Sequence, residues 1–192
     1  GMAADIVNGV LDERGPCLGG LVFGTEDAQT FIANARSAGL PAADPMPGHG
    51  KDEQTGAKRR WHNIFWDPAA ARGIFSFCIQ HDSGSTLPDA TPTVGEPISG
   101  VDHVVVKTQS VEAAKRFYGE QLGIRLALEQ QVPEWGGTQL FFRASSMSIE
   151  VIASEKAPEQ DELWGLALKT NDITATRERL VSSGCKVSDI RN

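Results

Sequence analysis

The sequence has 192 residues, of which 40% are hydrophobic and 22% are charged, a balance typical of a globular protein and not of a disordered chain. Its formal net charge is −7 and its longest basic run is Lys58-Arg59-Arg60, which argues against nucleic acid as a partner. No apolar stretch approaches the roughly 20 residues that cross a bilayer, and the three cysteines lack a paired spacing. We therefore expect a cytoplasmic protein with reduced thiols and with neither a nucleic-acid nor a membrane partner.

One segment occurs three times along the chain: a short apolar strand that closes with Thr, followed by an amphipathic helix that closes with Gly. The copies cover residues 21–39, 104–123 and 166–184, and the separations between Thr and Gly are 14, 15 and 14 residues. Such regular spacing indicates that one supersecondary unit is repeated. The strands are predicted from their β-branched and aromatic residues, which lie between polar turns.

Each helix is predicted from apolar residues at i, i+3 and i+4 spacing. In the second copy these residues are Val111, Ala114, Phe117 and Tyr118. A polar residue that can cap the N-terminus precedes each helix, and a glycine suited to a left-handed C-cap follows it. The capping candidates are Glu26 or Asp27, Ser110 and Asp172, and the glycines are Gly39, Gly123 and Gly184.

The residues that follow the second helix predict three further strands. Residues 124–128, 139–143 and 148–152 are short apolar segments separated by polar turns, which is the pattern of an antiparallel meander. The complete unit is therefore βαβββ.

The first and third copies keep parts of this pattern. In the first, strands are expected at residues 60–66 and 75–80, after a Pro/Gly-rich loop over residues 41–57, of which residues 47–50 are interpreted as a flexible loop. In the third, a strand is expected at residues 185–190 and the rest of the meander is missing.

These patterns divide the chain into five segments. They are an N-terminal segment (1–15), a first βαβββ module (16–82), a linker (83–99), a second βαβββ module (100–155) and a partial β-α-β module (161–192). The linker is predicted from its Ser, Thr, Pro, Gly and Asp content, which cannot bury a core. Because only a short turn over residues 154–161 joins the second and third modules, we expect these two to pair.

The second copy is similar to the modules of the vicinal oxygen chelate superfamily, which includes glyoxalase I, the extradiol dioxygenases and the bleomycin-resistance proteins. The resemblance rests on the segments Val101-Asp-His-Val-Val-Val, Ala113-Ala-Lys-Arg-Phe-Tyr-Gly-Glu-Gln-Leu-Gly123 and Ile149-Glu-Val-Ile152. It implies an α+β fold in which pairs of βαβββ modules form half-open barrels around a cleft. It also implies a divalent metal, held by the first and last strands, that chelates two adjacent substrate oxygens.

Carried over to this chain, the metal-ligand positions of the resemblance fall on His103 and Glu150. Imidazole and carboxylate suit Zn, Fe, Ni or Mn. Gly20 and Gly165 stand where the other copies would carry His103, and Cys78 lies within one residue of the position of Glu150, so the ligand set is incomplete. Other donors that could complete it are His62, His81 and Cys78. The alternative for His103 is a strand histidine hydrogen-bonded to a neighbour.

Four further side chains are candidates for substrate contact. Aromatic residues dominate the walls of ligand sites, and an arginine can hold an anionic group. The candidates are Trp61, Trp135, Phe141 and Arg143. The alternatives are packing roles for the tryptophans and a solvated strand end for Arg143.

The resemblance implies a glyoxalase-like protein that acts on a small metabolite with vicinal oxygens as a lyase, isomerase or dioxygenase. In that hypothesis a metal at His103 and Glu150 polarises an oxygen while Glu150, as the catalytic carboxylate, moves a proton. The rival hypothesis is a metal-free protein of the bleomycin-resistance type that sequesters a small molecule. Because an unpaired module leaves strand edges exposed, we also expect a homodimer.

Overall fold

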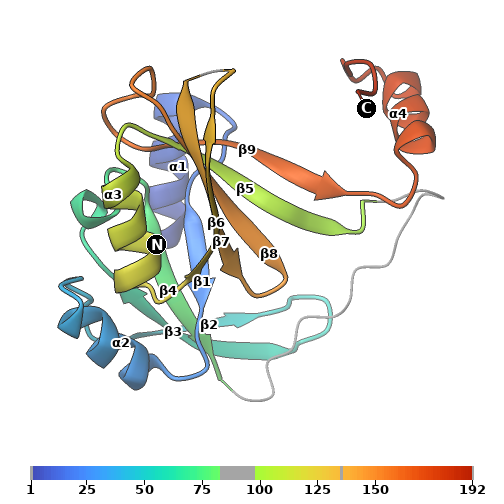
Figure 1. Ribbon diagram of the computed structural model, residues 1–192. Helices are drawn as coiled ribbons and strands as arrows, with labels where there is room; N and C mark the ends of the chain where they lie inside the picture. The colour runs from blue at the N-terminus through green and yellow to red at the C-terminus, as the bar shows by residue number, and fades with distance from the viewer. Residues whose placement is uncertain (1, 83–97, 135, 192) are drawn as a thin grey trace.

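The computed structural model describes residues 2–82, 98–134 and 136–191 (Figure 1). Most of the predicted linker, residues 83–97, lies outside this description, as does the predicted substrate-contact residue Trp135. The described residues form two separate β-sheets with helices. The fold class is α+β, as predicted.

The first sheet, sheet A, has four strands in the order β1-β4-β3-β2. Its strands are β1 (Leu21–Gly24), β2 (Met46–Lys51), β3 (Lys58–Phe65) and β4 (Ser76–His81). The second sheet, sheet B, has five strands in the order β6-β7-β8-β5-β9. Its strands are β5 (Gly100–Thr108), β6 (Arg125–Val132), β7 (Gly137–Ala144), β8 (Met147–Ala153) and β9 (Glu162–Lys169). In each sheet the first strand of the unit is parallel to the last, since β1 pairs with β4 and β5 with β8.

The helices begin and end largely where the repeat predicts. They are α1 (Met2–Arg14), α2 (Ala28–Ser37), the short 3-10 helix η1 (Pro68–Ala71), α3 (Val111–Ala114), its π-helical continuation η2 (Lys115–Gln121), and α4 (Ile173–Ser182). The side chains of Asp27, Ser110 and Asp172 accept hydrogen bonds from the first-turn amides of α2, α3 and α4. The glycines that close these helices, at residues 39, 123 and 184, have φ of 83°, 69° and 80°.

The core lies between the helices and one face of each sheet. Figure 1 shows α2 and α3 on the same side of the molecule, whereas α4 lies at the other end beyond β9. Trp66, which follows β3, joins the two halves of this core, because its ring lies 6.3 Å from Phe117 of η2 and 6.2 Å from Phe31 of α2. Ile64 of sheet A and Val106 of sheet B are fully buried in the same cluster. The first and second units therefore share a core although their sheets are separate.

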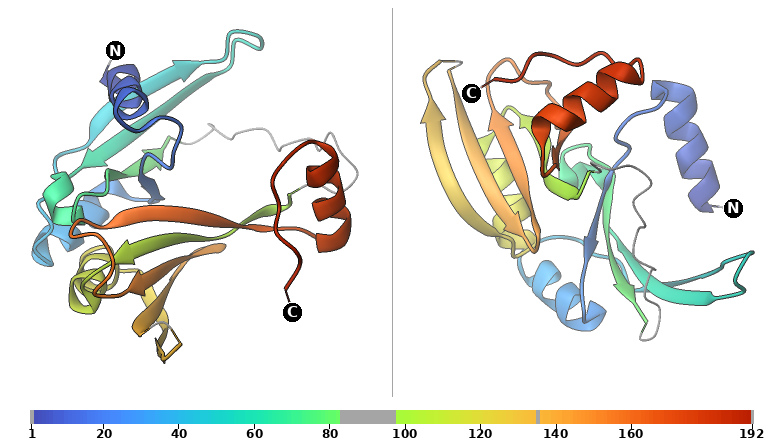
Figure 2. Two further views of the ribbon diagram at one scale, coloured as in Figure 1. Left: turned by 90° about the horizontal axis from the view of Figure 1, so that it is seen from above. Right: turned by 90° about the vertical axis from the view of Figure 1, so that its right-hand side faces the viewer.

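Strand β9 of the third unit extends sheet B, and the two views of Figure 2 show it beside β5. It pairs antiparallel with β5, from Gly100 opposite Lys169 to Lys107 opposite Glu162. Strand β9 of the third unit thus pairs with β5 of the second, as the short connection between these two units predicts.

The prediction of a flexible loop at residues 47–50 is wrong, because these residues belong to strand β2. Strand β2 pairs antiparallel with β3 from Met46 opposite Asn63 to Lys51 opposite Lys58. A Cβ added to Gly48 would lie 2.3 Å from Nε1 of Trp61, so the glycine leaves room for the indole against the strand. The strand is stabilised by its neighbour and not by its own weak β-propensity.

The strand expected at residues 185–190 is also absent, since the described residues 185–191 form neither helix nor strand. Arg177 of α4 instead binds this segment: its Nε donates to the carbonyl of Ser188 at 2.9 Å, and its Nη2 lies 2.8 Å from Oδ1 of Asp189. The segment therefore folds back on α4, where it has local partners, and does not extend a sheet.

Candidate functional site on the open face of sheet B

Sheet B has one face toward the core and one face away from it, which we call the open face. On β5, Val104 and Val106 belong to the buried core, so the alternating residues His103, Val105 and Lys107 lie on the open face. The cross-strand register extends this face to the neighbouring strands: Glu150 of β8 lies opposite Val105, and Phe141 of β7 lies opposite Glu150. The open face therefore gathers both residues that the resemblance marks as ligands.

His103 and Glu150 are in direct contact. Nε2 of His103 lies 2.9 Å from Oε2 of Glu150, and their side chains are 22% and 10% exposed. They belong to adjacent parallel strands, offset by two residues in the pairing register. A carboxylate this buried is costly unless it has hydrogen-bonding partners, and His103 is one of them.

Asp102 contacts the other ring nitrogen of His103, at 2.9 Å from Nδ1. Adjacent residues of a regular strand point to opposite faces, but the β5–β9 register slips between Val101 and His103, so that Asp102 is the extra residue of a β-bulge. The hydrogen bond from His103 lowers the pKa of Asp102, and Lys169, whose Nζ lies 3.4 Å from Oδ1, lowers it further. The bulge thus brings a second carboxylate to the imidazole.

Gln139 of β7 holds the other oxygen of Glu150. Its amide Nε2 donates to Oε1 of Glu150, and its own Oε1 accepts from Nε2 of Gln130 on β6 at 2.5 Å. The result is a continuous polar chain across all five strands of sheet B, which we call the polar chain. Its members are Gln130, Gln139, Glu150, His103, Asp102 and Lys169.

The N–H donors available to His103 limit which groups of the polar chain can be protonated. A neutral imidazole has one N–H group, whereas both ring nitrogens of His103 face a carboxylate oxygen at 2.9 Å. Both contacts are hydrogen bonds only if the imidazole carries two protons or one of the carboxyl groups is protonated.

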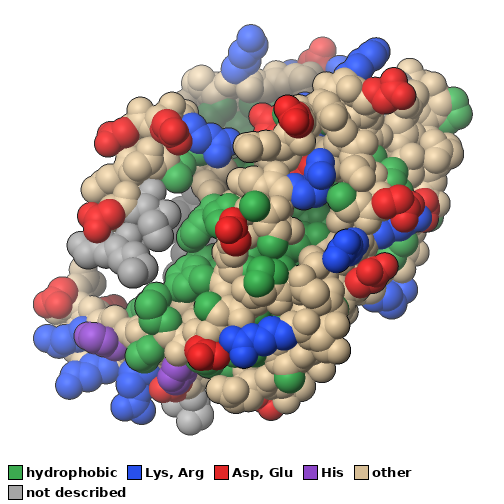
Figure 3. Space-filling view, turned by 90° about the vertical axis from the view of Figure 1, so that its left-hand side faces the viewer, with side chains coloured by type: hydrophobic (Ala, Val, Ile, Leu, Met, Phe, Trp, Pro, Cys, Tyr) green, Lys and Arg blue, Asp and Glu red, His purple; other side chains and the backbone are tan. Residues whose placement is uncertain are grey.

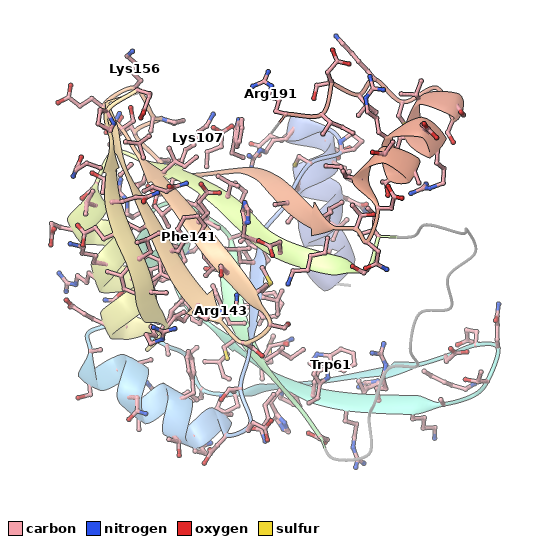
Figure 4. The ribbon with its side chains drawn as sticks, turned by 45° about the vertical axis from the view of Figure 1, so that its right-hand side comes forward. Trp61, Lys107, Phe141, Arg143, Lys156 and Arg191 are labelled. Atoms are coloured by element: carbon pink, nitrogen blue, oxygen red, sulfur yellow. The ribbon has the colours of Figure 1, made fainter. Side chains whose placement is uncertain are left out.

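Of the predicted substrate-contact residues, Phe141 and Arg143 lie on this face. The ring of Phe141 meets that of His103 edge-on, with centroids 6.1 Å apart and planes at 87°. Arg143 lies two residues farther along β7, and its Nη1 donates to Oγ of Ser148 at 3.2 Å. Trp61 belongs to sheet A, and Figure 4 shows it well apart from Phe141 and Arg143.

The residues present do not fit a complete site for the divalent metal that the resemblance implies. Catalytic metal sites of the zinc type take three protein ligands, but His103 and Glu150 are two. Gly165 holds the position of His103 in the third unit, and a Cβ there would meet no atom within 4 Å. Among the described residues no group of three or more His, Cys, Asp and Glu side chains is arranged to hold a metal ion.

The other donors considered from the sequence lie in sheet A. Cys78 is buried in the core, where burial raises the pKa of its thiol to about 11. Nδ1 of His62 lies 3.3 Å from Oδ1 of Asp82, and His81 lies opposite Trp61 in the β3–β4 pairing. None of these residues is in sheet B, so they do not complete the set.

Sequence reasoning missed Asp102 and Gln139. Gln139 alternates with Phe141 on the same strand, so the period-two pattern that selects Phe141 also selects Gln139. Asp102 carries no such signal, because alternation assigns it to the opposite face from His103 and only the bulge reverses this.

Comparison with known proteins supports the fold. Residues 102–192 match the sequence model of the Glyoxalase/Bleomycin resistance protein/Dioxygenase superfamily. No curated protein matches the sequence significantly. Within the described part of the chain, no helix is long and apolar enough to cross a membrane.

Three solved structures illustrate the likeness. A hypothetical protein from Staphylococcus aureus has 11% identity over 86% of this chain and 63% of its own, with a TM-score of 0.60. A mutant of 4-hydroxymandelate synthase from Streptomyces coelicolor has 17% identity over 93% of this chain and 56% of its own, with a TM-score of 0.59. Methylmalonyl-CoA epimerase from Mycobacterium tuberculosis has 23% identity over 45% of this chain and 65% of its own, with a TM-score of 0.40.

This chain spans less than two thirds of the length of each of these proteins. At these identities, the Staphylococcus aureus protein and the 4-hydroxymandelate synthase mutant show the fold alone. This is the glyoxalase fold that the repeated βαβββ units predict. Residues 102–192, just under half of the chain, are thus similar to the Glyoxalase/Bleomycin resistance protein/Dioxygenase superfamily.

Proposed function

We propose that the open face of sheet B binds a small metabolite with two adjacent oxygens and that Glu150 and His103 move a proton on it. The observation that carries this proposal is the position of Glu150, a nearly buried carboxylate with one oxygen held by Gln139 and the other 2.9 Å from His103. A fixed carboxylate beside an imidazole is the arrangement that general acid–base catalysis uses.

The roles follow from the contacts. Glu150 would take the proton from a carbon next to a carbonyl group, and His103, once both its nitrogens carry protons, would give one to the oxygen that becomes negative. Asp102 would orient the imidazole through Nδ1. This chemistry corresponds to an isomerase or lyase, and it needs only the side chains of the polar chain.

The test is hydrogen exchange with solvent. The protein is incubated in D2O with 2-oxo and 2-hydroxy aldehydes and acids, and proton NMR follows the loss of the signal from the carbon next to the carbonyl. The wild type is expected to exchange at least one of these compounds, and Glu150→Gln to slow the exchange by about a hundredfold.

Glu129→Gln is the matched control for this assay. Glu129 lies on β6 opposite the buried Leu140, on the core side of the sheet, and pairs with Lys115 at 2.8 Å. Its variant should exchange at the wild-type rate. Equal rates for the wild type and Glu150→Gln, with both proteins folded, would contradict the proposal.

A second candidate function is binding without chemistry, as in a protein that sequesters a small molecule. It is favoured by the fact that the oxygens of Glu150 and the nitrogens of His103 already have partners within the chain. In the same NMR experiment this function would give line broadening of a bound compound with no exchange of its protons.

We further propose that a second copy of the chain covers part of sheet A. Strand β1 pairs with β4 on one side, and no described strand pairs with its other side. Val22 of β1 is 55% exposed and Met46 of β2 is 36% exposed, and Figure 3 shows hydrophobic side chains gathered in a hollow on one face of the molecule. Light scattering should give twice the chain mass of 20.6 kDa, and a single 20.6 kDa species at high concentration would contradict the dimer.

A cytoplasmic location agrees with the state of the cysteines. All three are free in the structure: Cys17 and Cys185 are exposed and Cys78 is buried. Exposed free thiols are typical of proteins in a reducing compartment. Fractionation of cells that produce the native protein would test this.

A further inference from the structure

A second β-bulge in the β5–β9 pairing brings Trp164 to the open face. The register passes from Val105 opposite Gly165 to Val106 opposite Leu163, so Trp164 is the extra residue on β9. The bulges at Asp102 and Trp164 hold the same place in successive units, six residues before Thr108 and Thr170. The position that supplies a carboxylate in the second unit therefore supplies an indole in the third.

Trp164 is an exposed residue and does not belong to the buried core. Trp164 is 59% exposed, although tryptophan has the largest of the apolar side chains. The ammonium of Lys107 lies over one face of its ring, 4.4 Å from the centroid. The next residue, Gly165, leaves open space beside it, since an added Cβ would contact nothing within 4 Å.

Lys107 gives this surface a positive charge. It lies four residues from His103 along β5, about 13 Å at the rise of a strand. Among the described residues no carboxylate forms an ion pair with it, and its ammonium contacts the indole ring of Trp164. A cation held over an aromatic ring beside an open strand surface is suited to bind an anion whose own ring stacks on the indole.

We propose that Trp164 and Lys107 form a subsite for a planar anion, an aromatic or conjugated carboxylate whose ring lies on the indole and whose carboxylate pairs with the ammonium. The inference rests on the proposed function, because it names the part of the substrate that reaches beyond the polar chain. A substrate of this class would span from Lys107 to Glu150, with its planar group in the third unit and its reacting carbon in the second. The third unit would then bind the planar group, and the second unit would transfer the proton.

The test uses benzoate and the indole N–H signals of nitrogen-15-labelled protein. The chain has four tryptophans, and Trp164→Phe identifies the signal of Trp164 by its loss. Benzoate at millimolar concentration should shift that signal and leave those of Trp61 and Trp66 in place. Cyclohexanecarboxylate is not planar and benzamide is not charged. Each should therefore need a concentration at least about fivefold higher than benzoate to shift the Trp164 signal equally.

Two lysine variants separate charge from general effects. Lys107→Met keeps the aliphatic stem and should weaken benzoate about tenfold, whereas Lys107→Arg should stay within about threefold of the wild type. Lys115→Met is the control, because Lys115 pairs with Glu129 on the core side of the sheet. Equal weakening by Lys107→Met and Lys115→Met, or shifts of Trp61 in place of Trp164, would overturn the subsite.

Failure of this proposal is distinguishable from failure of the proposed function. If Glu150→Gln still binds benzoate at Trp164 but no compound exchanges protons, the subsite stands and the catalytic proposal falls. If proton exchange occurs and benzoate leaves Trp164 unshifted, the catalytic proposal stands and the subsite falls.

Discussion

Arg72 and Asp161 bind each other through both their side chains and their backbones. Nε of Arg72 lies 2.8 Å from Oδ1 of Asp161, and the amide of Asp161 donates to the carbonyl of Arg72 at 3.0 Å. Arg72 ends the helix η1 of the first unit with φ of 53°, and Asp161 lies just before β9. The carboxylate is only 4% exposed, whereas the guanidinium side chain is 29% exposed. This pair joins the first unit to the start of the third.

Arg72→Met should therefore lower the free energy of unfolding by about 3 kcal/mol, because it leaves a buried carboxylate without its cation. Urea unfolding followed by circular dichroism measures this. The control is Asp44→Asn, which breaks the ion pair of Arg36 with an 88% exposed carboxylate and should cost less than about 1 kcal/mol. Equal losses of unfolding free energy in the two variants would mean that the Arg72–Asp161 contact stabilises the protein no more than a surface ion pair does.

Gly48 and Gly50 of β2 provide a matched pair of substitutions. A Cβ at Gly48 would lie 2.3 Å from the Trp61 ring, but a Cβ at Gly50 would lie at an ordinary contact distance of 3.4 Å. Gly48→Ala should destabilise the protein by about 1 to 3 kcal/mol and alter the fluorescence of Trp61. Gly50→Ala should leave stability within about 0.5 kcal/mol of the wild type, and a loss as large as that of Gly48→Ala would show that the indole is not the cause.

Tyr118 should resist ionisation in the folded protein. It is 1% exposed, and burial, with a smaller effect of the Asp161 charge, raises the pKa of its phenol far above the ordinary value. The unfolded chain therefore loses this proton first, so stability is unaffected below about pH 10 and decreases as the pH rises above it. Because Tyr118 is the single tyrosine, absorbance at 295 nm should not rise near pH 10 until the protein unfolds, and a normal titration of the folded protein would contradict its burial.

Metal analysis tests the interpretation of the ligand set. Because His103 and Glu150 supply two donors where three are usual, protein purified without chelator should contain well under one equivalent of Zn, Fe, Ni or Mn. Dialysis against these metals followed by mass spectrometry gives the content, with His103→Ala as the comparison. One equivalent in the wild type, lost in His103→Ala, would show that the site is completed by groups not in the polar chain.

The repeated strand and helix of each unit could be predicted because their signals are local. Asp27, Ser110 and Asp172 cap their helices through their own side chains, and the closing glycines adopt the left-handed conformation that their residue type favours. The α+β class follows from these elements. The positions of His103 and Glu150 came instead from the resemblance of the second unit to the vicinal oxygen chelate superfamily.

The elements that were missed depend on partners distant in sequence. Strand β2 has two glycines and a proline and forms because β3 pairs with it and Trp61 covers it. The bulge at Asp102 is a property of the register between β5 and β9, about 60 residues apart, and no single strand encodes it. Residues 185–190 were expected to form a strand, but Arg177 binds Ser188 and Asp189 and holds the segment on α4. Long-range pairing decided each of these outcomes.

Gly165 makes the open face adaptable by a single substitution. It is equivalent to His103 in the third unit, its φ does not require glycine, and the space beside it is free of other atoms. A histidine introduced there would stand on the strand next to His103, whose pairing partner on β9 is Ala167, two residues away. Gly165→His is thus expected to bind Ni²⁺ more tightly than the wild type by isothermal titration calorimetry. The variant would be an engineered metal site with two imidazoles and a carboxylate in place.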